Sequence, residues 1–170
     1  MLREEASAPF AAGSFTDGYL FMLGGRHYEA YRVFSNLYTD WQANAALHFN
    51  MCMCLAQVCQ YDAALQCIAR AQEALPPAGI GSTAPPGGAS AALFTAQAAG
   101  YAYFSPMPDA MPLLFPDECR LAVLRLQVDV LLAAGRWQEV LETAAPLRGQ
   151  GYANIEAAVQ EAETCLRATG

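Results

Sequence analysis

The sequence predicts an all-α protein in which antiparallel helical hairpins stack one on another. A pattern of small and large apolar residues recurs after 34 residues, so that Ala30 and Ala64 occupy the same place in two successive units. Very short connections separate the predicted helices, which forces neighbouring helices to run antiparallel. Apolar residues make up 55% of the chain and charged residues 15%, a balance typical of helices that are buried on more than one side.

The first four helices are predicted from start and stop signals. Ser14 followed by Asp17 forms a start that is similar to a capping box, and Pro76 with Pro77 ends the fourth helix. The predicted ranges are 14–24, 26–39, 42–58 and 60–75. Because the third helix is apolar almost all round, we expect it to be the most buried element.

An insert rich in glycine and proline follows at residues 77–116. We expect a flexible loop at residues 76–89 and a helical stretch at 90–104, whereas four prolines within 105–116 predict an extended or turn-rich segment. The pattern resumes 76 residues after Ala64, at Val140. Two arrangements fit this spacing: a degraded repeat with an insertion, or an ordinary repeat interrupted by an inserted segment.

Three more helices are predicted after the insert. Asp117, which follows Pro116, is expected to be the N-cap of a helix that ends at Ala134. A helix over 136–147 comes next, and the last helix covers 154–168. Its apolar residues form one stripe from Ile155 to Leu166, and its other faces are polar. The terminal unit of a helical stack requires one polar face that is exposed to solvent.

The repeated pattern occurs at three places. Residues 25–30 read GRHYEA, residues 59–64 read CQYDAA and residues 135–140 read GRWQEV. Antiparallel helices approach closely only where a small side chain meets a large one, and the turn between them favours a residue that tolerates an unusual backbone conformation. Gly25 and Gly135 meet the requirement of the turn, whereas Cys59 is not expected to meet it.

This combination of a small turn residue, an aromatic residue, alanine, a large apolar residue, alanine and a terminal proline resembles helix B of the tetratricopeptide repeat (TPR) family. Gly18 and Phe21 resemble the glycine and the aromatic residue of its helix A, whereas Asp17 and Gln127 stand where large apolar residues are usual. The resemblance implies a single TPR-like domain over 1–170, a right-handed superhelical stack. Its repeats would lie at about 11–44, 45–76 and 118–152, with a capping helix at 153–168.

The resemblance also implies which residues of each helix A line a concave groove for a partner. By register these are Phe15, Tyr19, Met22, Leu23, Phe49, Met53, Gln57, Arg125 and Asp129, with Ala12, Ala46 and Ala56 beside them. A surface rich in aromatic residues and methionine suits an extended peptide or an amphipathic helix. The alternative interpretation is that the aromatic residues and methionines are core, covered by residues 90–116.

Composition narrows the classes of partner. Sixteen acidic residues, nine arginines and no lysine leave a net charge of -7, which disfavours nucleic acid. The lack of lysine removes Schiff-base chemistry and the phosphate-binding loop. No apolar stretch reaches the roughly 20 residues of a membrane span. Six cysteines without a predicted leader favour a reducing, cytoplasmic location, where thiols act as small core residues.

The residues predict no catalytic, cofactor or metal site. Cys52 and Cys54 point away from each other on a helix, so buried thiols are favoured over zinc ligands. His27 and His48 lack a nucleophile in an activating context, which favours packing or hydrogen bonding over catalysis. We therefore do not expect an enzyme.

The expected function is binding or scaffolding of another protein, through a peptide or an amphipathic helix in the groove. A narrower version is similar to type III secretion chaperones, which hold translocators in an apolar groove, although the insert departs from that class. An alternative is a small-molecule or enzymatic site between insert and repeats that uses His48, Cys54 or Tyr103. Exposed apolar faces would also allow a homodimer.

Overall fold

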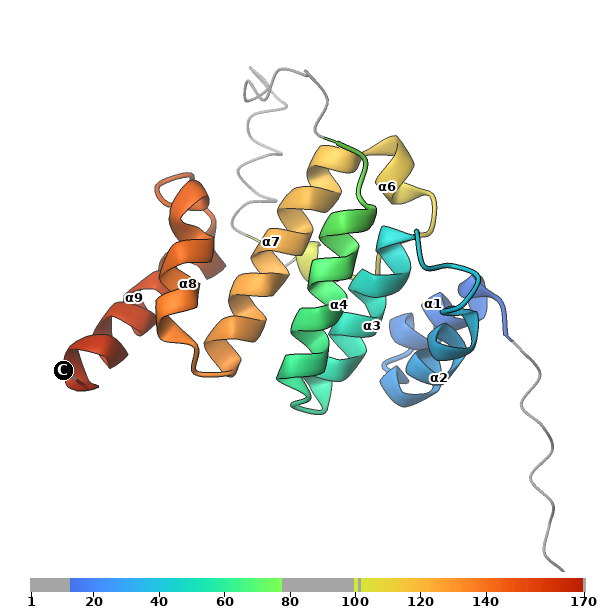
Figure 1. Cartoon of the computed structure of the whole chain (residues 1–170), viewed down its shortest axis with the longest axis horizontal. Helices are drawn as coiled ribbons and strands as arrows, with labels where there is room; N and C mark the ends of the chain where they lie inside the picture. Colours follow the sequence, from blue (N-terminus) through green and yellow to red (C-terminus); the bar gives the residue numbers. More distant parts are fainter. Residues whose placement is uncertain (1–12, 78–99, 101, 170) are drawn as a thin grey trace, which may run out of the picture.

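The structure is a computed structural model that describes residues 13–77, 100 and 102–169. Every regular element within these residues is helical, which confirms the all-α class (Figure 1). In chain order the elements are α1 (Phe15–Leu23), α2 (His27–Leu37), α3 (Ala45–Gln57), α4 (Tyr61–Ala74), the 3-10 turn η1 (Ala102–Phe104), α6 (Met111–Leu114), α7 (Pro116–Ala133), α8 (Trp137–Ala144), the 3-10 turn η2 (Ala145–Leu147) and α9 (Ala153–Thr169).

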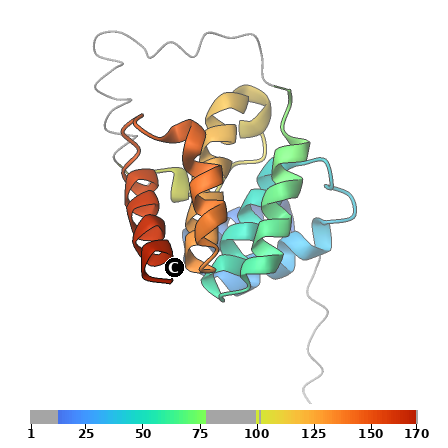
Figure 2. The same ribbon diagram turned by 60° about the vertical axis from the view of Figure 1, so that its left-hand side comes forward.

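The long helices follow one another across the molecule as hairpins. α1 packs on α2, α3 on α4 and α7 on α8, while α2 also contacts α3 and α4 contacts α7. α9 lies against α8 and α7 at the end of the row (Figures 1 and 2). Because α7 packs directly on α4, the third hairpin follows the second in space. Within the described residues, no further hairpin lies between α4 and α7.

Small residues lie where the two helices of a hairpin meet. Ala30, Ala64 and Val140 occupy the same place in α2, α4 and α8, and each is 0% exposed. In the first hairpin, Gly18 of α1 lies against the ring of Phe34, so close that an added Cβ would stand 2.5 Å from Phe34 Cε1. The small-against-large packing expected from the sequence pattern is present here.

The three hairpin turns share one backbone conformation. The φ angle is +73° at Gly25, +57° at Cys59 and +70° at Gly135. In each turn the next residue donates its N–H to a carbonyl five residues back, as in a Schellman motif; for Cys59 this bond joins Gln60 N to Leu55 O at 3.0 Å. The expectation that Cys59 would not serve this turn is wrong, although the left-handed region is strained for any residue with a Cβ.

The structure confirms one predicted helix start and corrects two others. Ser14 and Asp17 form the capping box, with Ser14 N donating to Asp17 Oδ2 at 2.7 Å. α3 begins at Ala45, later than predicted, because the Asn44 side chain caps it by accepting Leu47 N at 2.9 Å. α7 begins at Pro116, because a proline has no backbone N–H that would be left without a partner at the first helical position. Asp117 therefore lies inside the first turn rather than at the N-cap.

The insert is described only in its second half. Of the predicted loop at 76–89 and the helical stretch at 90–104, residues 78–99 and 101 lie outside the described part of the chain. The short turn η1 falls within the predicted helical stretch. The segment expected to be extended, 105–116, contains the four-residue helix α6, which has Pro112 in its first turn, where a proline is tolerated.

The core is centred on α3. Every residue from Ala45 to Leu55 is buried, including His48 and Asn50, which confirms the prediction for this helix. α9 buries one stripe, Ile155, Ala158, Val159 and Ala162, and exposes its other faces, as the amphipathic pattern predicted.

Candidate functional site

The predicted groove residues divide into buried and exposed groups. Phe15, Met22, Phe49 and Met53 are at most 5% exposed and belong to the same core cluster. Tyr19 and Asp129 are half-buried, Arg125 is buried, and Leu23 and Gln57 are exposed at the ends of their helices. Both methionines and the two phenylalanines are therefore covered, and only Tyr19 among the aromatic members is partly open to solvent within the described residues.

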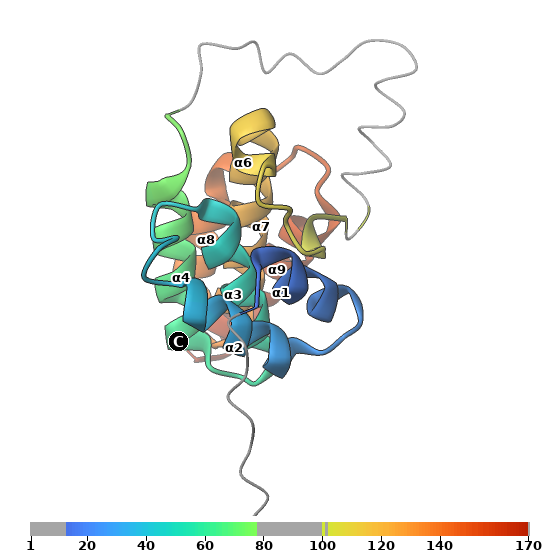
Figure 3. The same cartoon turned by 90° about the vertical axis from the view of Figure 1, so that its right-hand side faces the viewer.

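Part of what covers them is the second half of the insert. The stretch between η1 and α6 runs beside α3 (Figure 3). The Asn50 side chain holds its backbone in both directions: Nδ2 donates to Met107 O at 2.9 Å, and Met107 N donates to Asn50 Oδ1 at 2.7 Å. Both residues are buried, and the Met107 side chain joins the core around α3. A pair separated by 57 positions in the chain leaves no local pattern in the sequence.

Arg125 of α7 holds the beginning of the described insert. Its guanidinium lies 3.9 Å from the centre of the Tyr103 ring and 5.0 Å from that of Tyr152, which places it between two aromatic rings. Nη2 donates to Gly100 O at 3.1 Å, and Nε donates to Asn154 Oδ1 at 2.8 Å. Burial lowers the pKa of Arg125, but the guanidinium remains charged at neutral pH.

Asp129, one turn further along α7, completes this contact. Its carboxylate accepts hydrogen bonds from the Tyr103 hydroxyl and from Asn154 Nδ2, the latter at 2.9 Å. Burial raises the pKa of Asp129, and the two hydrogen bonds oppose the rise. The two charged residues predicted to line the groove therefore contact Gly100 and Tyr103 of their own chain.

A shallow cleft of about 320 Å³ opens beside this polar cluster, lined by Tyr103, Phe104, Asp129, Leu132, Asn154, Ala157 and Ala158. Its lining is mostly apolar, and the polar groups of Tyr103, Asp129 and Asn154 bond to one another. This arrangement fixes the insert to α7 and α9 and resembles a structural contact more than a reactive site.

His48 and Cys54, the other residues named for a small-molecule site, lie elsewhere. His48 is buried at the start of α3, where its Nε2 is 2.8 Å from Gln42 O and its ring meets the edge of Tyr38. Burial lowers the pKa of His48, which keeps the imidazole neutral. Cys54 is buried, and burial raises its pKa to about 12. Tyr103 lines the cleft beside Asp129, whereas His48 and Cys54 line neither of the two clefts described here.

The other three buried cysteines follow the same physical rule. Cys52, Cys67 and Cys119 are buried, and burial raises the pKa of each thiol, to about 11 for Cys67 and Cys119. Such thiols are poor nucleophiles and poor ligands at neutral pH. Within the described ranges, no three His, Cys, Asp or Glu side chains come together as metal ligands.

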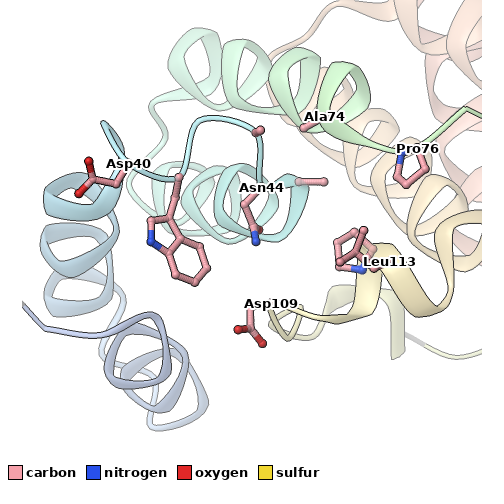
Figure 4. Close-up of a pocket in the computed structure, with 10 residues that line it drawn as sticks. Asp40, Asn44, Ala74, Pro76, Asp109 and Leu113 are labelled. Carbon is pink, nitrogen blue, oxygen red and sulfur yellow. The ribbon is translucent and has the colours of Figure 1, made fainter.

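An open cleft of about 310 Å³ lies on another part of the surface (Figure 4). It is bordered by the connection between α2 and α3, by the end of α4 and by the beginning of α6. Its lining comprises Asp40, Trp41, Ala43, Asn44, Ala45, Ala74, Pro76, Asp109, Pro112 and Leu113. Most of the surface that these residues present is apolar.

Three consecutive apolar residues continue outward from this cleft. Leu113 is 78% exposed, Leu114 67% and Phe115 52%. They occupy the junction between α6 and α7, and we call them the apolar ledge. Their residue types do not distinguish them from core residues. The neighbouring Pro112 and Pro116 were a signal of their exposure, because two prolines restrict the backbone conformations by which this short segment could pack its side chains into the core.

Comparisons with known proteins identify no relative. No family model matches the chain, and neither the curated proteins nor the solved structures contain a match. Within the described residues, no helix has both the length and the apolar character needed to cross a membrane.

Proposed function

We propose that this chain is a TPR-like interaction module that binds another protein at the apolar ledge and the open cleft beside it. The ledge carries this proposal. Isolated exposed apolar residues are normal on protein surfaces, whereas a contiguous apolar patch beside a cleft is typical of an interaction site. Leu113 and Leu114 end α6, and Phe115 is the N-cap of α7, so the ledge is attached directly to a long helix of the stack.

The size of the ledge suits a transient contact. Full burial of a leucine or phenylalanine side chain contributes about 1.5–3 kcal/mol. Covering the exposed parts of Leu113, Leu114 and Phe115 would then contribute roughly 3–6 kcal/mol, scaled by their exposed fractions of 78%, 67% and 52%. That contribution corresponds to weak binding unless further contacts in the cleft add to it.

The experiment compares three forms of the full chain: the wild type, the Leu113→Ser/Phe115→Ser double variant and a Tyr28→Ser control. Tyr28 is 72% exposed on α2, so the control removes an apolar side chain of similar size elsewhere. Serine at position 115 is a favourable N-cap for α7, which protects the fold of the double variant. A photoreactive residue at position 114 crosslinks the partner inside cells of the source organism.

We expect crosslinked partners with the wild type and the control, and their loss with the ledge variant. Circular dichroism of the three proteins should be the same. Equal crosslinking by the ledge variant would refute the proposal.

A further inference from the structure

The cleft beside the ledge has acidic groups at its border. Asp40 and Trp41 come from the connection between α2 and α3, and Asp109 comes from the segment before α6. Figure 4 shows Asp40 at the outer edge and Asp109 on the other side, below the start of α3. Both carboxylates are exposed, and neither joins an ion pair with another described residue.

Trp41 adds an aromatic surface to these charges. One face of its indole stacks on Phe15, with ring centroids 5.3 Å apart and ring planes inclined by 14°. This contact holds the ring in place while its remaining surface lines the cleft. An aromatic ring near carboxylates attracts a cation, because the ring face carries partial negative charge.

An opposing effect comes from α3, whose N-terminus opens on the same cleft at Asn44 and Ala45. A helix N-terminus carries about half a positive charge. A full positive charge also lies at the edge of the cleft, where the Arg120 guanidinium donates to Pro76 O. The two negative charges of Asp40 and Asp109 exceed this charge and the half charge of the helix together, so the cleft keeps a net preference for a positive group. Asn44 uses Oδ1 to cap α3, which leaves its amide NH2 to donate to a carbonyl oxygen of a bound chain.

We propose that the cleft accepts an arginine or lysine side chain of a partner peptide, while bulky apolar residues of the same peptide cover the ledge. This inference rests on the proposed function and names the chemistry of the segment that is bound. A basic group beside apolar side chains complements a cleft that is lined by Asp40, Trp41 and Asp109 as well as by Leu113.

Charge argues against two other occupants. A second copy of the chain would bring a net charge of -7 to an acidic surface. Residues 78–99 come after the cleft residue Pro76 in the sequence, and they contain no basic side chain. A partner of different sequence meets the requirement better than either.

The test uses a short labelled amphipathic peptide with leucine on one face and arginine on the other, and the same peptide with citrulline in place of arginine. Citrulline keeps the shape and removes the charge. Trp137→Phe leaves Trp41 as the single tryptophan, so its fluorescence reports binding at the cleft. The variants are Asp40→Asn/Asp109→Asn, with Glu161→Gln on the exposed face of α9 as the control.

We expect the arginine peptide to bind about three- to tenfold more tightly than the citrulline peptide, as expected for two exposed ion pairs. The difference should vanish in the double Asn variant and in 0.5 M salt, and persist in Glu161→Gln. In Asp109→Asn the new amide oxygen would still accept the hydrogen bond from Ala110 N that the carboxylate accepts now, so the local backbone is preserved.

Three results would overturn the inference. Equal affinities for both peptides, with binding that still depends on Leu113 and Phe115, would refute the basic side chain and leave protein binding at the ledge intact. No binding of either peptide, together with unchanged crosslinking by the ledge variant, would refute both proposals. A dimer in sedimentation that Leu113→Ser dissociates would assign the ledge to a second copy.

Discussion

Replacing Cys59 with glycine is expected to stabilise the protein. Cys59 has a φ angle of +57° at the position that glycine occupies in the other two hairpin turns. A residue with a Cβ in this region costs about 1–2 kcal/mol. Glycine removes that cost but increases the conformational entropy of the unfolded chain, which offsets about 0.4–1 kcal/mol. The net gain in the free energy of unfolding is about 0.5–1 kcal/mol.

Urea and thermal denaturation followed by circular dichroism measure this gain. For a domain of 170 residues, it corresponds to a rise in Tm of about 1–4 °C. Cys59 is exposed, and its thiol raises the pKa of the nearby Tyr61 hydroxyl, so the effect of removing the thiol must be measured separately. Cys59→Ala serves this purpose, because it removes the thiol and keeps the Cβ in the left-handed region.

The reverse substitution provides an independent control. No atom lies within 4 Å of a Cβ added at Gly25, so Gly25→Ala changes only the backbone preference. It should lower the free energy of unfolding by about 1 kcal/mol. If Cys59→Gly is no more stable than Cys59→Ala while Gly25→Ala is destabilised, the turns are not equivalent and the argument from shared geometry is refuted.

Three further predictions follow from the packing. Gly18→Ala should lower the free energy of unfolding by about 1–2 kcal/mol, because the new Cβ would stand 2.5 Å from Phe34 Cε1 and this clash outweighs the better helix propensity of alanine. In urea denaturation, Phe34→Leu should restore the stability that Gly18→Ala loses. Asn50→Ala should lower the free energy of unfolding by about 2–4 kcal/mol and speed amide exchange at Met107, because the N–H and C=O of Met107 would lose their buried partners. Asn36→Ala, on the exposed side of α2, should change neither quantity. Burial lowers the pKa of His48, so as the pH falls the unfolded chain binds the proton before the folded chain does, and Tm should fall as the pH drops below the ordinary pKa of 6.5. His48→Gln, which can still donate to Gln42 O, should flatten this dependence between about pH 7.5 and 5. An equally steep dependence in that variant would assign it to other groups.

Several features of the fold were predictable because their causes are local. The capping box of Ser14 and Asp17 needs only residues three apart, and the small residues at Ala30 and Ala64 recur with the period of the repeat. Even the left-handed turn at Cys59 had a signal, since this residue aligns with Gly25. The preference of cysteine alone disfavours a left-handed backbone, but the packing of the surrounding hairpin imposes that conformation. The start of α3 at Asn44 was also signalled, by the most common type of capping residue.

The candidate site was predicted less well, because it depends on which surfaces meet. Register placed Phe49 and Met53 on a groove, and the hydrophobic character of both residues fits a groove and a core equally. In the structure both residues belong to the core around α3, to which the insert contributes Met107, paired with Asn50. The exposed position of Leu113 likewise depends on how α6 meets α7, which no periodicity describes.

The sequence by itself determined the helical class, the hairpin turns and most helix boundaries, since these follow from hydrogen bonds and steric limits within a few residues. Only the tertiary structure decided where the described part of the insert lies, which apolar residues remain exposed and which charges are paired. Those outcomes depend on contacts between distant segments, such as Tyr103 with Asp129, in which burial and hydrogen bonding must be satisfied at the same time. For this protein the proposed binding surface belongs to the second group, beside the end of the insert rather than on the repeat pattern itself.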